Sequence, residues 1–456
     1  MKNLIKTSLA NFTGKTAKKV IKLLKRRGTH TPGVVARKID RNILKNIAKP
    51  QDIYVITGTN GKTTTTNLVA DILEGMGIKS ISNRIGSNTY AGIVTSLLDG
   101  NNYFGKNKIK HAVLEVDEQW CTVTLKDLHI KSLTITNLFQ DSYERNANIF
   151  YIVERIEKGL PENIKLILNA EDSISAYIGK KNQRVYFSVD NIFNDHEQSD
   201  GKIKDLIYVP ETDQRIIWDF NRYNHIGKYH SEDFTFKNPK AKYHVVGYNE
   251  VNNNLIVKED GIIFEMPNIR KNIESVYNQI AAYATLRENG FKREDILQQM
   301  LKIKTVESRY ISEHIGNKEL ISMVAKGYNP VANSCVLNEI SNNPKPKTVI
   351  YLFDNLESKY LDSKSSAWAF SIDFKYLATV DRFIIRSRHY HEILLAVLMS
   401  GIDKSKIVRL DSLEAVTEYL DPHKQECIYI LHDIERENLA QADKMYKIVK
   451  EYVGKI

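Results

Sequence analysis

Short apolar runs alternate with stretches of helical periodicity over the first third of the chain. An uninterrupted run such as 53–56 predicts a buried strand, and apolar residues that recur every three or four positions, as in 64–74, predict a helix. Further strands are predicted at 112–116, 132–136 and 166–168. Because strands that alternate with helices form parallel sheets, we predict an α/β fold with a doubly wound parallel sheet.

The pattern changes over residues 190–270, which are rich in Asn, Asp, Tyr and Lys and hold short alternating stretches. We interpret them as an antiparallel β subdomain inserted into the α/β domain, which a helix at 274–288 resumes. A loop at 342–346 opens a second α/β series, with strands predicted at 349–353, 382–385, 407–410 and 427–431. The predicted parts are a basic N-terminal segment, a central domain and a C-terminal Rossmann-like α/β domain, at 1–48, 49–304 and 305–456.

The first 27 residues combine basic and apolar side chains and contain no acidic one. Their spacing predicts an amphipathic helix or helix pair. We favour a solvated helix that packs on the body through Val20, Leu23 and Leu24. Attraction to anionic lipid headgroups or to a membrane-borne substrate is the alternative. Nucleic acid is not an expected partner, because no basic motif with interleaved aromatic residues supports it.

Composition narrows the class of protein. The chain has 456 residues, 65 Lys and Arg against 55 Asp and Glu, and 42% hydrophobic residues, which suffices for packed cores. Its three cysteines, Cys121, Cys335 and Cys427, form no CxxC pair, so we expect neither a disulfide framework nor a cysteine-built zinc site. No apolar run approaches the ~18–20 residues that span a bilayer. We therefore expect a cytoplasmic protein, at most one that works at the inner membrane surface.

The segment TGTNGKTT at 57–64 carries the strongest chemical signal. It lies between a predicted strand and a helix start, where glycines allow backbone N–H groups to surround a phosphate and the helix adds its positive end. Lys62 is placed to neutralise phosphate oxygens and Thr63 to ligate Mg²⁺. Ile56 stands where the common GxxxxGK[ST] loop has glycine, which separates this loop from most P-loop NTPases. The predicted nucleotide contacts are Gly58, Thr59, Asn60, Gly61, Lys62, Thr63 and Thr64.

An acidic cluster, LEVDE at 114–118, follows the next predicted strand. The carboxyl ends of strands are where doubly wound folds bind ligands. One of these carboxylates is therefore predicted to hold the Mg²⁺ that bridges the phosphates.

Together these motifs resemble the central domain of the Mur ligase family. The resemblance rests on TGTNGKTT, LEVDE, Thr136-Asn137 with Asp141, and NAED at 169–172. It is closest to the MurT-like branch, the synthetase subunits of lipid II isoglutaminyl synthase, through the basic start, NRIGSN at 83–88 and YNQIAA at 277–282.

The resemblance implies an ATP- and Mg²⁺-dependent carbon–nitrogen ligase of cell-wall (peptidoglycan) synthesis. The D-glutamate α-carboxylate of lipid II would be activated as an acyl phosphate, and ammonia from a GatD-like class I glutamine amidotransferase would displace the phosphate. Activation is needed because a carboxylate is a poor electrophile, and Lys62 with Mg²⁺ would neutralise the developing charge.

Carried over by motif, several residues receive roles. Thr63 and Glu115 would ligate Mg²⁺, Asn278 would face adenine, and Asn137 with Asp141 would line the cleft. The resemblance also implies a nucleotide contact for Arg309 and catalytic roles for Lys326, in a Lys-Asn-Pro-like stretch with an insertion, and for Asp373.

The sequence departs from this branch in an inserted zinc ribbon, where Ser231 and Phe234 stand in place of cysteines. Without thiolates a tetrahedral zinc–sulfur site cannot form, so we predict no zinc. His225 and His230 are interpreted as structural rather than as metal ligands. The insert is predicted to be held by aromatic packing, through Trp218, Phe220, Tyr223, Tyr229 and Phe236.

Further departures are Ser142, Ile311 and Ser371. In the branch, one aspartate near 371–373 is thought to complete the partner's Cys-His pair; here the first position is Ser371 and the second Asp373, and either could be the catalytic one. These losses keep two alternatives open: a nucleotide-binding pseudoenzyme or scaffold in a cell-wall ligase complex, and a Mur-like ligase with another acceptor.

Overall fold

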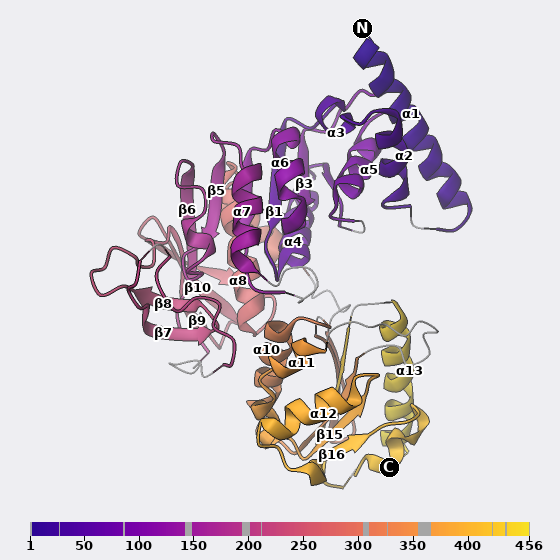
Figure 1. Ribbon diagram of the computed structural model, residues 1–456, viewed down its shortest axis with the longest axis vertical. Coiled ribbons are helices and arrows are strands. Elements are labelled where there is room, and N and C mark those ends of the chain that lie inside the picture. The colour runs from indigo at the N-terminus through magenta and orange to yellow at the C-terminus, as the bar shows by residue number, and fades with distance from the viewer. Residues whose placement is uncertain are drawn as a thin grey trace. The chain divides into compact units, whose positions relative to one another are not determined.

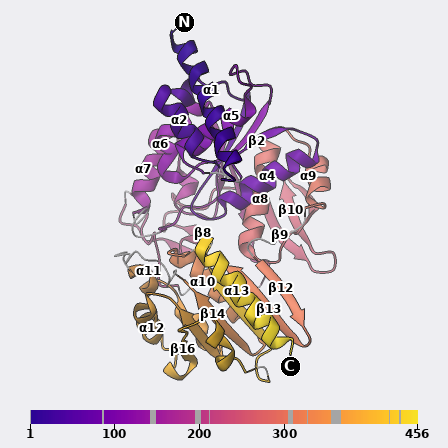
Figure 2. The same ribbon diagram turned by 90° about the vertical axis from the view of Figure 1, so that its right-hand side faces the viewer.

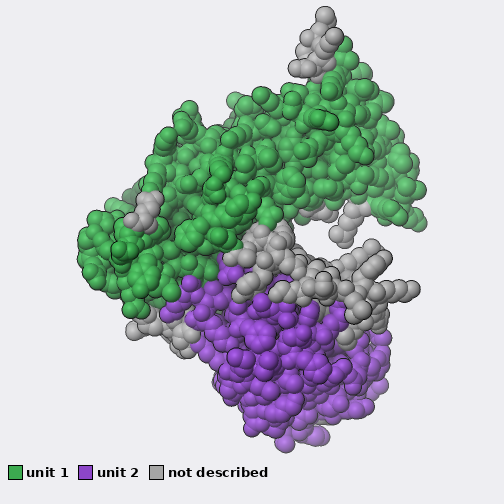
Figure 3. Space-filling model, viewed as in Figure 1, with its two compact units in different colours: residues 1–139, 148–199, 205–304 green, residues 140–147, 200–204, 305–456 purple. Residues whose placement is uncertain are grey.

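The computed structural model describes the chain from residue 2 to residue 455 except for 27, 85–86, 142–147, 194–200, 211, 304–309, 326, 354–365, 422 and 434–435. It contains two compact units, each described by itself (Figure 3). Unit 1 comprises residues 1–139, 148–199 and 205–304, and unit 2 comprises residues 140–147, 200–204 and 305–456.

A nine-stranded sheet forms the centre of unit 1, in the order β11-β10-β9-β6-β5-β4-β1-β3-β2. Neighbouring strands from β2 to β9 are parallel, and β9, β10 and β11 are antiparallel. The predicted doubly wound α/β fold is confirmed. The strands are β1 (Asp52–Thr57), β2 (Ser80–Ser82), β3 (His111–Glu115), β4 (Ser132–Ile135), β5 (Lys165–Asn169), β6 (Gln183–Val189), β9 (Tyr243–Asn249), β10 (Asn254–Glu259) and β11 (Ile262–Pro267).

Helices cover both faces of this sheet (Figures 1 and 2). On one face α4 (Lys62–Gly75) packs against α8 (Ile273–Glu288), with α9 (Arg293–Met300) beside them, and on the other α6 (Cys121–Leu128) packs against α7 (Ile149–Gly159). Strand β1 is buried along its whole length, as expected for a central strand with both faces covered. The sheet therefore holds the loop after β1 rigidly at its carboxyl edge.

The predicted β excursion at 190–270 divides in two. Strands β7 (Ile217–Tyr223) and β8 (Ile226–His230) form a separate antiparallel pair, whereas β9–β11 join the central sheet through the parallel pairing of β9 with β6. The antiparallel strands at 243–267 therefore extend the central sheet, and β7 and β8 form a separate pair. Polar and apolar residues alternate in both parts of the segment, so this pattern does not distinguish them. They differ in that one part forms hydrogen bonds with the edge of β6.

Aromatic side chains pack around the β7–β8 pair, which lies in a segment that we call the ribbon (residues 205–210 and 212–238). Phe236 stacks on Tyr177 with ring centroids 4.3 Å apart, and Tyr229 contacts Phe236 and Trp218 at 5.3 and 5.6 Å. The predicted aromatic packing is thus present for three of the five residues. The other two face elsewhere, Tyr223 toward Phe139 and Phe220 toward the Arg222 guanidinium.

The N-terminal helices α1 (Lys2–Leu23), α2 (Thr31–Ile39) and α3 (Ile43–Asn46) pack together with α5 (Tyr90–Gly100). The favoured packing of the first helix was wrong, because Val20, Leu23 and Leu24 are 49%, 76% and 66% exposed. The side of α1 that meets the body carries Ala10 and Gly14, whose small size lets α2 and α5 approach closely. No helix among the described residues is both long and apolar enough to cross a membrane.

Unit 2 is a second α/β layer structure around a six-stranded sheet, in the order β12-β13-β17-β14-β15-β16. The hairpin β12–β13 is antiparallel and the other pairs are parallel. The sequence did not predict this hairpin, because half of the residues in β12 are polar. The elements are β12 (Tyr310–Ile315), β13 (Lys318–Val324), α10 (Pro330–Ser341), β14 (Lys347–Leu352), α11 (Ala367–Phe370), β15 (Arg382–Arg386), α12 (Tyr390–Met399), β16 (Ile407–Arg409), β17 (Cys427–His432) and α13 (Arg436–Val453).

Candidate nucleotide-binding site

The loop between β1 and α4 depends on two glycines in the left-handed half of backbone space. Gly58 has φ 131° and Gly61 has φ 80°. A Cβ at Gly58 would lie 2.2 Å from Thr136 Oγ1, and one at Gly61 would lie 2.0 Å from Asn278 Oδ1. Only glycine fits either position, because the neighbouring atoms leave no room for a side chain. The structure thus contains the tight glycine turn that the sequence predicted.

Asn137 braces this loop from the end of β4. Its side-chain oxygen accepts the Asn60 N–H at 2.9 Å, and its amide group donates to the Asn60 carbonyl at 3.2 Å. The Asn137 carbonyl also accepts the Thr59 N–H at 2.8 Å. These bonds make Asn137 a residue that positions the loop; its predicted contact with nucleotide stays a prediction.

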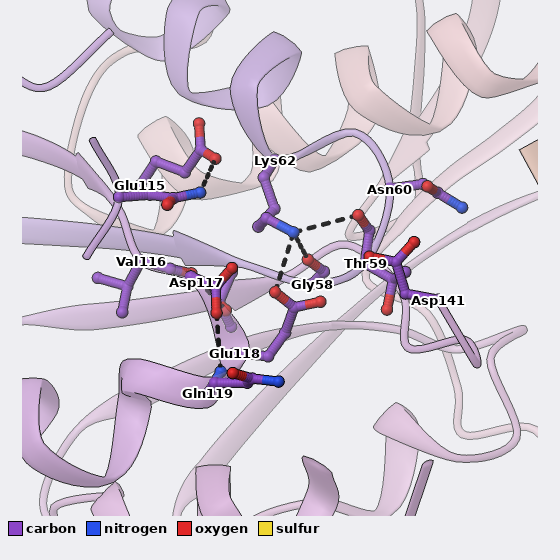
Figure 4. Close-up of polar contacts among 12 residues, drawn as sticks. Gly58, Thr59, Asn60, Lys62, Glu115, Val116, Asp117, Glu118, Gln119 and Asp141 are labelled. Carbon is purple, nitrogen blue, oxygen red and sulfur yellow. Dashed lines mark hydrogen bonds and ion pairs between the residues drawn. The ribbon is translucent and has the colours of Figure 1, made fainter. Parts of the chain in front are cut away.

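Lys62 is 9% exposed and points back into the loop (Figure 4). Its Nζ donates to the Gly58 carbonyl, to the Thr59 carbonyl at 3.1 Å and to Glu118 Oε2 at 3.0 Å. Burial disfavours the charge, but the carboxylates of Glu118, Glu115 and Asp117 outweigh it and raise the pKa of Lys62. Lys62 is therefore an ammonium at neutral pH, held where a phosphate oxygen would need it.

Two carboxylates at the carboxyl end of β3 have different surroundings. Glu115 is clamped by two asparagines: Asn88 donates to its Oε1 at 2.9 Å, and Asn83 bonds both its N–H and its carbonyl at 2.8 Å. Glu118 is 1% exposed, and its Oε1 is buried with no hydrogen-bond partner among the described residues. The sequence indicated the acidic cluster but did not distinguish Glu118 within it. The contact of Glu118 with Lys62 depends on the turn after β3, which the sequence alone did not predict.

The residues present fit a magnesium nucleotide. A buried carboxylate oxygen without a partner, an ammonium, and a glycine turn at the start of the 14-residue helix α4 are the features that bind phosphate and a divalent cation. Thr63 and Thr64, in the first turn of α4, are partly exposed. Asn278 lies on α8 against that turn, where its side-chain oxygen accepts from Thr65 Oγ1 at 3.4 Å.

Other predicted site residues lie in unit 2 or outside the described residues. Asp141 accepts from Asn329 Nδ2 at 2.7 Å, within unit 2. Asp373 is 6% exposed and its Oδ1 accepts the Lys202 N–H at 2.9 Å, while Ser371 is partly exposed. Ile311 is 43% exposed on β12. Three named residues, Ser142, Arg309 and Lys326, lie outside the part of the chain that the structure describes.

A buried histidine links the ribbon to the loop that braces the site. His225 is fully buried, its Nε2 lies 3.2 Å from Asp172 Oδ1, and its Nδ1 lies 3.0 Å from Asn224 Oδ1. Asp172 Oδ2 in turn accepts the Leu138 N–H at 2.8 Å, next to Asn137. Burial opposes ionisation of Asp172, but His225 and the backbone N–H of Ser175 together lower its pKa. The sequence marked both residues without indicating that they meet.

Hydrogen bonds close the ribbon turn where cysteines were expected in this branch. Ser231 Oγ donates to Asp233 Oδ1 at 2.6 Å and accepts the Phe236 N–H at 3.1 Å. His230 stacks on Phe234 with ring centroids 4.1 Å apart. No group of three or more His, Cys, Asp or Glu suited to a metal ion occurs in the described part of the chain.

Because Ser231 and Phe234 stand in place of cysteines, we expect the purified protein to carry no stoichiometric zinc and EDTA to leave its thermal unfolding unchanged. Structural zinc normally contributes folding free energy directly, so its removal from a loaded ribbon would lower the melting temperature. Elemental analysis and unfolding scans with and without chelator test this. One zinc per chain together with a chelator-induced loss of stability would contradict it.

Comparisons with known proteins agree with the motifs over nearly the whole chain. Residues 56–258 match the family model of the Mur ligase middle domain, and residues 327–434 match that of the MurT ligase C-terminal domain. The MurT subunit of lipid II isoglutaminyl synthase (glutamine-hydrolyzing) from Staphylococcus aureus (strain COL) is 30% identical over 413 residues, covering 89% of this chain and 91% of that protein. The corresponding subunit from Streptococcus pneumoniae is 29% identical over 444 residues, with 94% of each chain covered.

Solved structures share the fold. A pseudomurein peptide ligase type C from Methanothermus fervidus has a TM-score of 0.65 at 21% identity, covering 91% of this chain and 80% of that one. A MurF ligase from Thermotoga maritima in complex with ADP has a TM-score of 0.59 at 14% identity, covering 93% and 84%. With the curated relatives matched along most of their length, the chain belongs to the MurT branch of the Mur ligase family.

Proposed function

We propose that this chain is an ATP-dependent amide ligase that converts the D-glutamate α-carboxylate of lipid II to a carboxamide. The observation that carries the proposal is the Lys62 ammonium, held in a glycine turn beside Glu118, whose buried Oε1 has no hydrogen-bond partner among the described residues. The names of the MurT relatives support lipid II as the acceptor and glutamine as the ammonia source.

The proposed reaction has two steps. A carboxylate oxygen of the acceptor attacks the γ-phosphorus of ATP, the bond to the bridging oxygen breaks, and ADP leaves. Ammonia then attacks the acyl carbon, and phosphate leaves with its bonding electrons while the nitrogen loses a proton. Both steps place negative charge on phosphate oxygens, which loop N–H groups and the Lys62 ammonium are placed to stabilise.

Mg²⁺ would be held by Thr63 and Glu115, with Glu118 as an additional oxygen ligand. Bound there, the ion would supply charge neutralisation on the phosphates. For Lys62 to reach a phosphate oxygen, it must exchange its contact with Glu118 for one with nucleotide, and a cation beside Glu118 would compensate the carboxylate that Lys62 leaves.

The ammonia is proposed to come from a GatD-like class I glutamine amidotransferase subunit. Asp373 remains the candidate for orienting that partner's catalytic histidine, because it is the carboxylate that survives in this stretch. Its Oδ1 would first have to release the Lys202 N–H. Roles for Arg309 and Lys326 are proposed on the motif alone.

The decisive experiment supplies lipid II, ATP, Mg²⁺ and ammonium to the purified chain. We expect one ADP for each carboxamide, detected by mass spectrometry of the lipid, and no turnover with lipid II whose α-carboxylate is already amidated. Glutamine should replace ammonium only when the glutaminase subunit is added. Tight ATP binding without ADP formation on any acceptor would instead establish the scaffold function that Ser371 and Ile311 suggest.

A further inference from the structure

The outward side of α1 carries an apolar stripe, which Thr16 interrupts between Phe12 and Val20. Ile5, Leu9, Phe12, Val20 and Leu23 are spaced by three, four or eight residues, which places them on one side of a helix. Their exposed fractions are 67%, 53%, 51%, 49% and 76%. At 1.5 Å per residue the stripe is about 27 Å long. Scattered exposed apolar residues are ordinary, but a stripe along a whole helix marks a contact surface.

A neighbouring loop extends this stripe. Tyr103 and Phe104, between α5 and β3, are 42% and 83% exposed, and the Tyr103 ring lies 5.7 Å from that of Phe12. Asn11 fixes the loop against the helix, because its Nδ2 donates to the carbonyls of Asn102 and Tyr103 at 2.9 and 3.2 Å. The loop is therefore held in place beside α1, and its aromatic rings add to the exposed apolar surface.

Basic side chains surround the same surface. Exposed lysines and an arginine lie on α1, just after it and on the loop, namely Lys6, Lys19, Lys22, Lys25, Arg26, Lys106 and Lys108. No acidic residue occurs in the chain before Asp40. Asp99, which lies close to α1, is paired with Lys18. The field over the stripe is accordingly positive.

We propose that α1 and the 102–108 loop form a membrane-docking surface that lies flat on an anionic lipid bilayer. An apolar stripe with basic flanks matches what interfacial helices present, in which apolar residues enter the headgroup boundary and lysines meet anionic lipid. The opposite side of α1 is already buried against α2 and α5, so only this side is available. Figure 1 shows α1 at the outer edge of unit 1. The proposal does not depend on the ligase reaction.

Vesicle binding by the full-length protein tests it. We expect the protein to sediment with phosphatidylcholine vesicles that contain about 30% phosphatidylglycerol, and not with phosphatidylcholine alone. Binding should weaken as salt increases, because exposed charges are screened. Replacing Lys6, Lys19 and Lys22 with Gln, or Leu9, Phe12 and Leu23 with Ser, should each lower the partition coefficient at least about tenfold.

The control carries Ile262→Ser and Ile263→Ser on β11, the strand at the far edge of the sheet from β2. These side chains are 55% and 63% exposed, and the double variant should bind vesicles like the wild type. Melting temperatures establish that every variant is folded. Absence of binding to anionic vesicles, or equal binding by the stripe variants, would overturn the proposal. So would a dimer in solution that the Leu9, Phe12 and Leu23 changes dissociate without any effect of lipid.

Discussion

Lys62→Ala should lower ATP turnover by at least about 10³-fold, equivalent to roughly 4 kcal/mol of transition-state stabilisation. The ammonium is buried, has a raised pKa and lies where charge on the phosphates develops. Since no other cation contacts the Gly58 and Thr59 carbonyls in the described residues, nothing in the loop can take its place. The measurement is ADP release at saturating ATP, with nucleotide binding followed separately by calorimetry.

A second variant separates chemistry from folding. Lys62→Ala leaves the Glu118 carboxylate buried and uncompensated, which itself destabilises the loop. The double variant Lys62→Met with Glu118→Gln removes both charges, so it should melt near the wild-type temperature and still fail to turn over. Lys131→Ala, which removes a half-exposed lysine paired with Asp52, is the matched control and should keep full activity. Full turnover by the Lys62→Met double variant would refute the role of the loop.

His225→Ala should destabilise the ribbon and the loop after β4 by about 1–3 kcal/mol, because it removes the His225 contact from a buried carboxylate that keeps its bonds to the N–H groups of Leu138, Ile174 and Ser175. Asp172 is fully buried and also holds the Leu138 N–H, so the effect should reach the Asn137 brace and weaken nucleotide binding. Because the chain has two units, hydrogen exchange of the β7 and β8 amides measures this better than one global unfolding curve.

The loss of stability caused by His225→Ala should depend on pH, because the pKa of Asp172 is lowered in the folded protein. A carboxyl with a lowered folded pKa contributes stability above its unfolded value of about 3.9 and loses it as the pH falls through the folded value. The difference between wild type and His225→Ala should therefore narrow below about pH 4. Asp219→Asn is the control: its carboxylate is 62% exposed and pairs with His230, whose stack on Phe234 the change leaves in place, so it should cost under about 1 kcal/mol. Equal protection of the ribbon in both variants would show that the buried pair carries no stability.

Much of the fold was predictable because its signals are local. Buried strands such as β1 and β14 contain continuous apolar runs, and the helix after TGTNGKTT has a clear period. The phosphate loop was readable for the same reason: eight consecutive residues specify a turn, a charge and a hydroxyl. The pairing of the 243–267 segment with the central sheet had no such signal, since alternation is common to an inserted hairpin and to an edge extension of the sheet.

Amino-acid order alone thus determined the α/β class, the phosphate loop and the family branch, because each depends on neighbouring residues in one stretch of chain. The tertiary structure decided what depends on distant residues meeting. It places Glu118 beside Lys62, although the two residues are 56 positions apart in the chain. It also places His225 of the ribbon beside Asp172. It also decided which side of α1 is buried. Amphipathic spacing predicts a helix with two unlike sides, but small residues at the α1–α2 contact determined which of them packs inward.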